Sequence, residues 1–175
     1  MPHTIEPAAS GRSKCRGCGQ LIAKGELRFG ERLPNPFADG DMTVWLHLTC
    51  AAFKRPESLA EVIEDAPPEQ QQALSPVISH TTEHHRLQRI NGIERSPSAR
   101  ARCRHCREPI AKDDWRIPLA FFEEGMFNAS GNVHLTCSMA YFETTDIVDA
   151  LCQFGDLNDA ELAEVTQQLA SGAAP

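Results

Sequence analysis

The sequence lacks the features of a secreted, membrane-spanning or disulfide-bonded protein. No stretch approaches the roughly 18 consecutive apolar residues of a membrane span, and the first ten residues contain no apolar run typical of a signal peptide. The seven cysteines are an odd number, which argues against a disulfide framework. We therefore expect a soluble protein without a membrane partner, in an intracellular, reducing compartment: a bacterial cytoplasm and nucleoid, or a eukaryotic nucleus.

The sequence also lacks the signatures of an enzyme. It shows no Ser/His/Asp set and no glycine-rich loop for a phosphate, so we expect neither catalysis nor a small-molecule substrate. Basic residues are absent from residues 143–175, which carry seven Asp or Glu, whereas residues 11–55 carry eight Lys or Arg and four acids. With a net charge of −7, the chain is a poor non-specific nucleic-acid binder, but a locally basic face can still bind phosphates.

Two matched metal-ligand patterns are present, C-x2-C-x28-H-x2-C and C-x2-C-x27-H-x2-C. Three thiolates and one imidazole complete the tetrahedral shell of a structural zinc ion and leave no position open for a substrate. The sequence therefore predicts two structural zinc ions, with Cys152 left outside both sites. The predicted ligands are Cys15, Cys18, His47 and Cys50 in the first set, and Cys103, Cys106, His134 and Cys137 in the second.

The two patterns belong to an internal repeat of about 85 residues. Residues 12–18 match 100–106, and the sequence His-Leu-Thr-Cys occurs at both 47–50 and 134–137. We predict a first module with a helical extension over residues 1–79, a linker over 80–99, and a second module with an acidic helical extension over 100–175.

Each module is predicted to begin with strands and to end with helices. Residues 26–30 and 42–46 are strand-like, with turns at 34–36 and 39–40. Helices are predicted over 58–65 and from Pro67, with Pro76 bending or ending the second one. Asn158 and Glu161 form a capping-box pattern for a further helix. Because about forty residues cannot bury enough apolar area to fold alone, zinc must supply part of the stability.

The residues around the first site resemble the zinc finger of poly(ADP-ribose) polymerases, which a nuclear DNA ligase also carries. The resemblance runs from Ser10-Gly11-Arg12 through the ligands and Trp45, about residues 10–53, and extends less fully to 98–140, where the loop is one residue shorter. It implies a small α+β fold, with two tandem zinc-finger modules that each hold a short antiparallel sheet and a helix around one zinc and are followed by short acidic helices. It also implies recognition of DNA breaks by structure, not by sequence.

The same resemblance implies which residues contact DNA. Arg12 and Arg28 fall at the positions of the family's phosphate-contacting arginines, and neighbouring cations extend the strip. Apolar residues before the ligand histidine are expected to cover the exposed base pair at a strand end, although Asp41, Glu123 and Glu124 place negative charge near that face. The expected contacts are Arg12, Lys14, Arg16, Arg28, Phe37, Ala38 and Met42 in the first module, and Arg100, Arg102, Arg116, Met126 and Phe127 in the second.

Three functions are compatible with these patterns. The first is binding of DNA at strand breaks, nicks or ends. The second is a protein-interaction adaptor that keeps the zinc scaffold without DNA affinity and uses the acidic helices to hold a protein partner. The third is binding of RNA or single strands through the same aromatic loop.

Overall fold

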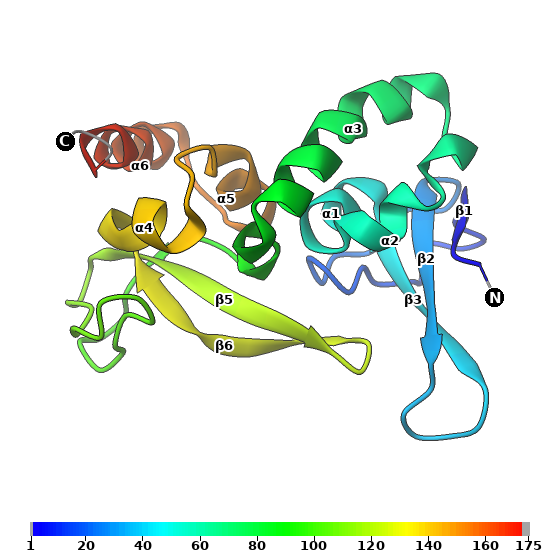
Figure 1. Ribbon diagram of the computed structural model, residues 1–175, viewed down its shortest axis with the longest axis horizontal. Helices are drawn as coiled ribbons and strands as arrows, with labels where there is room; N and C mark the ends of the chain where they lie inside the picture. The colour runs from blue at the N-terminus through cyan, green and yellow to red at the C-terminus, as the bar shows by residue number, and fades with distance from the viewer. Residues whose placement is uncertain (1, 173–175) are drawn as a thin grey trace. The chain divides into compact units, whose positions relative to one another are not determined.

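The computed structural model describes residues 2–172 and has the predicted small α+β fold with two three-stranded antiparallel sheets (Figure 1). Contacts divide the chain into two compact units: residues up to Glu83 together with Phe122–Phe127, and His84–Phe121 together with the residues from Asn128 onward. Among the described residues, no helix is both long and apolar enough to cross a membrane.

The sheet of the first unit has the strand order β1-β2-β3, with antiparallel neighbours. Phe29, Val44 and Leu46 are buried and form its core side. Gly30 lies at a crowded point of the sheet, since a Cβ there would come within 2.6 Å of Cζ3 of Trp45. The strands are β1 (Thr4–Pro7), β2 (Leu27–Pro34) and β3 (Asp41–His47).

Helices complete the core of the first unit, and α3 packs against α1 and α2 (Figure 1). Leu74 and Ile78 of α3 are buried, and the Thr81 hydroxyl donates to the Ala52 carbonyl oxygen at 2.8 Å. The helix continues past Pro76 to Glu83, because Pro76 is exposed and the residues after it pack against α1. The helices are α1 (Leu48–Lys54), α2 (Pro56–Ala60), the 3-10 turn η1 (Ile63–Asp65) and α3 (Pro68–Glu83).

Most of the second sheet, with the order β4-β5-β6, belongs to the second unit, whereas Phe122–Phe127 at its hairpin tip group with the first unit. The edge pairing of Glu94 with Arg116 in the second sheet repeats the pairing of Glu6 with Arg28 in the first sheet. The segment expected to be a linker, residues 80–99, thus contains the last turn of α3, a 3-10 turn and a strand. These elements are η2 (His85–Arg89), β4 (Glu94–Arg95), β5 (Trp115–Glu123) and β6 (Met126–His134).

The helices of the second unit follow its ligand histidine. The predicted capping box is confirmed, because the Glu161 N–H donates to Asn158 Oδ1 at 2.8 Å and the Asn158 N–H donates to Glu161 Oε1 at 3.2 Å. Val165 and Leu169 of the helix that follows are buried, so the acidic extension packs within its own unit. The elements are η3 (Leu135–Cys137), α4 (Ser138–Phe142), α5 (Val148–Phe154) and α6 (Asp159–Gly172).

Candidate metal centres and nucleic-acid interface

The ligands of the first centre come from a tight turn and from a strand-to-helix junction. The turn after Cys15 closes through the Gly19 N–H, which donates to the Cys15 carbonyl oxygen at 2.8 Å, with Gly19 at a φ of 75° that favours glycine. His47 ends β3, and Cys50 lies in the first turn of α1. Because Cys50 follows His47 by three residues across this junction, both side chains reach one point.

The ligand atoms of each set lie within 4.8 Å of one another. In the first set, His47 Nδ1 lies 3.4 Å from the Cys18 sulfur and 3.8 Å from the Cys50 sulfur. His47 Nε2 lies 3.2 Å from the carbonyl oxygen of Leu21. A hydrogen on Nε2 satisfies that contact and leaves Nδ1 free to bind a metal, the usual arrangement of a ligating histidine.

The second centre repeats this geometry. His134 Nδ1 lies 3.4 Å from the Cys106 sulfur and 3.7 Å from the Cys137 sulfur, and Nε2 lies 3.1 Å from the Pro109 carbonyl oxygen. In both centres the backbone N–H of the ligand histidine donates to the sulfur of the first cysteine at 3.3 Å. Three sulfurs and one nitrogen that converge in this way fit a structural zinc ion, so the chain holds two sites suited to zinc.

The Cys15 sulfur of the first centre is favoured as a thiolate, the form that binds zinc, whereas burial raises the pKa of Cys18. Hydrogen bonding from Cys50 lowers the pKa of Cys15 to about 4, and backbone N–H groups assist. Burial lowers the pKa of the Lys54 ammonium to about 8, although the negative charge of the Cys50 thiolate opposes this shift. Zinc bound to three thiolates carries one net negative charge, and Lys54 supplies a buried positive charge beside it.

The second centre is more exposed. Cys106 is exposed at the surface, whereas its counterpart Cys18 is half-buried. Burial raises the pKa of Cys137 to about 12, with a further contribution from the Cys103 charge. Tyr141 stands near the position that Lys54 holds in the first unit, so no matching cation follows the second ligand set.

The arginines that the resemblance assigned to phosphate contact fall into two groups. Arg28 is only 7% exposed; its guanidinium donates to Ser13 Oγ at 2.8 Å and to Glu6 Oε1 at 3.1 Å, and stacks 3.6 Å from the Trp45 ring centroid. Arg116 is half-buried and donates to Glu94 at 2.7 and 3.0 Å. The other candidate cations are exposed: Arg12, Lys14, Arg16, Arg100 and Arg102.

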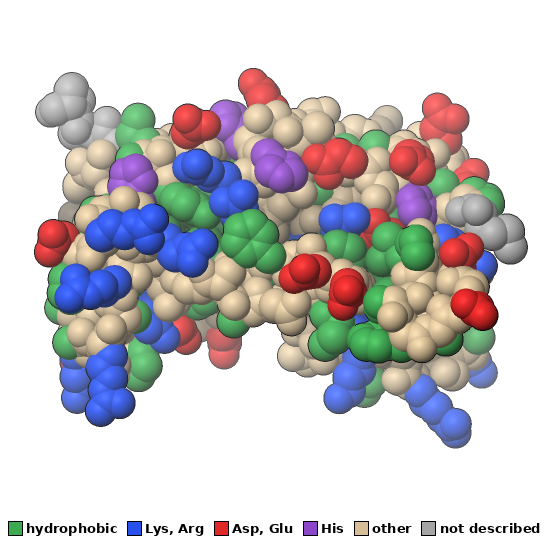
Figure 2. All heavy atoms as spheres, turned by 60° about the horizontal axis from the view of Figure 1, so that its bottom comes forward, with side chains coloured by type: hydrophobic (Ala, Val, Ile, Leu, Met, Phe, Trp, Pro, Cys, Tyr) green, Lys and Arg blue, Asp and Glu red, His purple; other side chains and the backbone are tan. Residues whose placement is uncertain are grey.

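The apolar candidates also differ between the two hairpins. Phe37 is 83% exposed in the loop between β2 and β3, with Ala38 exposed beside it and Met42 half-buried at the start of β3. Met126 is 50% exposed and Phe127 half-buried, but both lie on β6 and not in a loop, because β5 and β6 are joined directly by a tight turn. Figure 2 shows one face of the molecule, on which Lys and Arg side chains reach the surface beside hydrophobic ones.

Two features of the structure escaped the sequence reasoning. Glu31 of β2 is fully buried and accepts hydrogen bonds from Arg55 Nε at 2.9 Å, Arg55 Nη2 at 2.6 Å and Ser58 Oγ at 2.7 Å. This carboxylate ties the junction of α1 and α2 to the sheet. The sequence did contain a signal for this buried ion pair. Glu31 stands among the apolar residues of a strand, and Arg55 comes just after the helix that carries Cys50.

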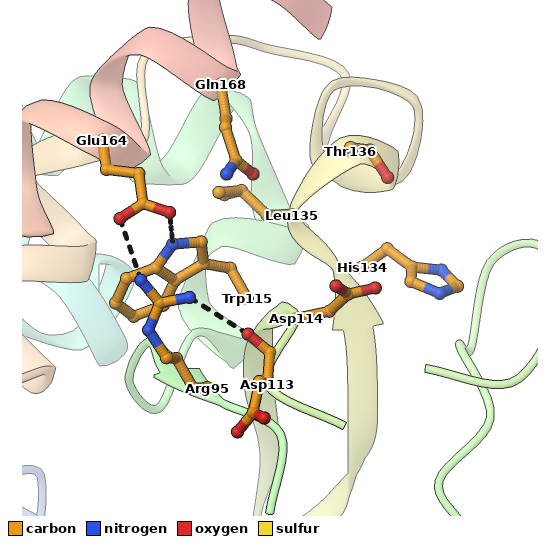
Figure 3. Close-up of a pocket in the computed structure, with 9 residues that line it drawn as sticks. All are labelled: Arg95, Asp113, Asp114, Trp115, His134, Leu135, Thr136, Glu164 and Gln168. Carbon is orange, nitrogen blue, oxygen red and sulfur yellow. Dashed lines mark hydrogen bonds and ion pairs between the residues drawn. The ribbon is translucent and has the colours of Figure 1, made fainter. Parts of the chain in front are cut away.

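The second feature is a cavity of about 220 Å³ in the second unit, bordered by His134 and α6 (Figure 3). Glu164 accepts hydrogen bonds from Trp115 Nε1 at 3.2 Å and from Arg95 at 2.8 Å, and Arg95 stacks over the Trp115 ring at 4.2 Å. The His134 ring points away from this cluster. Because these groups pair with one another, the cluster anchors α6 to the sheet.

The amino-acid sequence is similar to known proteins. The model of the poly(ADP-ribose) polymerase and DNA-ligase zinc-finger region matches residues 6–79. A poly(ADP-ribose) polymerase of Sarcophaga peregrina is 29% identical over 143 residues, covering 70% of this chain and 14% of that protein. Poly(ADP-ribose) polymerase 1 of Caenorhabditis elegans is 43% identical over 54 residues, covering 31% of this chain and 6% of that protein.

A third relative aligns with most of the chain. Polynucleotide 3'-phosphatase ZDP of Arabidopsis thaliana is 24% identical over an alignment of 194 residues, covering 94% of this chain and 28% of that protein. The chain thus spans a small part of each of these relatives. The family match and the Cys3His centre within it agree, and residues 6–79 form a PARP-type zinc finger.

Proposed function

We propose that the protein binds DNA at strand breaks, nicks or ends, that it recognises the shape of the break and not its base sequence, and that the second Cys3His unit is a second finger of the same type. The finger over residues 6–79 supports the first part of the proposal. The repeated ligand geometry and the repeated edge pairing support the second. Since all four donors of each centre bind the metal, the zinc acts structurally and the role is binding, without catalysis.

The observation that carries the proposal is the exposed ring of Phe37. Asn35 Oδ1 accepts the Phe37 N–H at 2.9 Å, and the Asn35 N–H donates to the Gly40 carbonyl oxygen at 3.0 Å, so the loop is closed and the ring projects outward. A broken strand exposes the face of an unstacked base, which an intact duplex does not offer. Stacking an aromatic ring on such a face is worth about 1–3 kcal/mol.

The exposed cations supply the sequence-independent part of the affinity. Arg12, Lys14 and Arg16 surround the turn that carries Cys15, and Arg100 and Arg102 hold the corresponding places in the second unit. An arginine fork offers two donors to one phosphate, which positions a protein on DNA without reading bases. These residues are therefore our candidates for the phosphate contacts.

Arg28 and Arg116 have a different role in this proposal. Each pairs with an acid on the neighbouring edge strand, and Arg28 is covered by Trp45. We expect them to affect DNA binding by holding the sheet together. Arg12→Ala should weaken binding to every DNA form without changing the unfolding midpoint, whereas Arg28→Ala should lower the midpoint.

The test compares the affinity for a nicked hairpin, a blunt duplex and a covalently closed dumbbell duplex at several salt concentrations. We expect tighter binding to the first two forms and a logarithmic salt slope of several units. Equal affinity for all three would refute recognition of breaks. Failure to bind any of them would favour the protein-interaction adaptor, and stronger binding to single-stranded RNA or DNA would favour the single-strand function.

A further inference from the structure

The strands of the two hairpins are joined in different ways. In the first hairpin (β2–β3), residues 35–40 separate Pro34 from Asp41 and form the loop that presents Phe37. In the second hairpin (β5–β6), only Glu124 and Gly125 separate the strands. The second hairpin therefore has no loop in which an aromatic ring can be presented as Phe37 is.

The turn of the second hairpin has a defined geometry. Glu124 and Gly125 have φ angles of 52° and 80°, both left-handed, which is the signature of a two-residue type I′ turn. Near this turn the Phe122 and Phe127 rings lie 4.8 Å apart and pack against each other. The Arg55 guanidinium lies 4.0 Å from the Phe122 ring centroid, and the Lys54 ammonium lies 4.6 Å from the Phe127 ring centroid, so both rings are engaged in packing. Met126, next to the turn, is 50% exposed.

The arrangement of the acidic residues near the turn also differs from that of the first loop. Glu123 and Glu124 are adjacent and exposed, whereas the two exposed acids at the first hairpin tip, Asp39 and Asp41, are separated by Gly40. At about 7 Å in water, each carboxylate lowers the affinity for a phosphate about threefold. A strand end carries phosphates on both sides of the break, so two adjacent carboxylates disfavour its approach.

From these differences we propose that the first hairpin alone covers the exposed base at a strand end, and that the second hairpin takes no part in this contact. This inference rests on the proposed function and adds which module supplies the preference for ends. The second unit then contributes ionic contacts through Arg100 and Arg102, which do not distinguish an end from an intact duplex. The two repeats have therefore diverged in role.

The experiment measures the ratio of affinities for the nicked hairpin and the closed dumbbell, by fluorescence anisotropy on the full zinc-loaded chain. Phe37→Ala should reduce this ratio by about 5- to 100-fold, as expected from the loss of one stacking contact. Met126→Ala is the matched control, an exposed apolar side chain of the other hairpin, and should change the ratio by less than about twofold. Both side chains are exposed, so neither change should unfold the protein.

A charge variant gives a second readout. Glu123→Gln combined with Glu124→Gln should strengthen binding to both DNA forms alike, by up to about tenfold, and leave the ratio unchanged. Three results would overturn the inference. The ratio of the two affinities could fall strongly in Met126→Ala, it could rise in the charge variant, or it could stay unchanged in Phe37→Ala. If the wild-type chain shows no preference for the nick, the proposed function itself fails, and that result is distinct from the other three.

Discussion

Replacing Arg55 with methionine should destabilise the first unit more than any surface change of similar size. The Glu31 side chain is 1% exposed, and Arg55 donates to it through Nε at 2.9 Å and Nη2 at 2.6 Å. Arg55→Met removes both donors and leaves a buried carboxylate with the Ser58 hydroxyl at 2.7 Å. Methionine keeps most of the apolar length of the arginine stem, so the change tests the guanidinium group, with its charge, its hydrogen bonds and its contact with the Phe122 ring at 4.0 Å.

The expected loss is about 3–5 kcal/mol of the free energy of unfolding, the usual cost of removing one partner from a buried ion pair. A typical domain is stable by about 5–15 kcal/mol, so the loss is a large fraction of the total. The free energy of unfolding falls by about 1–3 kcal/mol for each molar of urea, so the urea concentration at the unfolding midpoint should fall by roughly 2 M. Replacing Glu31 with methionine as well should recover most of the loss, because no buried charge then remains without its partner.

The assay is urea unfolding at saturating zinc in a Trp115→Phe background, in which Trp45 of β3 reports on the first unit. Glu61→Gln is the matched control, since Glu61 pairs with His3 at 3.4 Å but is 67% exposed, and an exposed pair is worth at most about 1 kcal/mol. Arg55→Lys keeps the charge and loses the fork, so it should fall between the two. If Arg55→Met shifts the midpoint no further than Glu61→Gln, the stabilising role of the buried pair is refuted.

Two further predictions concern the metal and the packing of the sheet. Elemental analysis should find two zinc ions per chain. Chelation or acidification should remove the ions and unfold both units, because the ligands bind zinc as thiolates and neutral imidazole. Full retention of the fold after loss of the metal would contradict this prediction. Gly30→Ala should lower the thermal midpoint measured by circular dichroism, at a cost of about 1–3 kcal/mol, because its Cβ would lie 2.6 Å from Trp45. Gly11→Ala, whose Cβ would meet nothing closer than 3.8 Å, should have little effect, and equal effects of the two changes would show that the contact with Trp45 is unimportant.

The zinc centres could be predicted from the sequence because their chemistry is local. A C-x2-C turn and an H-x2-C junction each hold two ligands by backbone geometry, so spacing alone predicts the donors. The capping box at Asn158 is local in the same way, and it was confirmed. Pro76 shows the limit of such rules, because the helix does not end there and Ile78 and Thr81 beyond it are buried.

The surroundings of the arginines could not be predicted with the same success. A single basic residue in a strand looks like surface charge, and only the packed sheet brings Trp45 over Arg28. One signal was nevertheless available, since Glu6 precedes Arg28 by the same number of residues as Glu94 precedes Arg116. This repeat extends through the expected linker and indicates an edge strand there. The two-residue turn of the second hairpin needs a positive φ at both central residues. Glu-Gly favours these angles less strongly than Asn-Gly does, so the sequence indicates the turn only weakly.

The unequal burial of the two ligand sets has a consequence for the exchange of zinc with other molecules. A competing thiol or chelator must reach a ligand sulfur before it can take the ion, and Cys106 offers that access while Cys15 and Cys50 are buried. Exchange with an external zinc acceptor therefore begins at the second set. Under zinc scarcity the chain would pass through a half-loaded form, in which the module that carries Phe37 keeps its ion and the other has lost it.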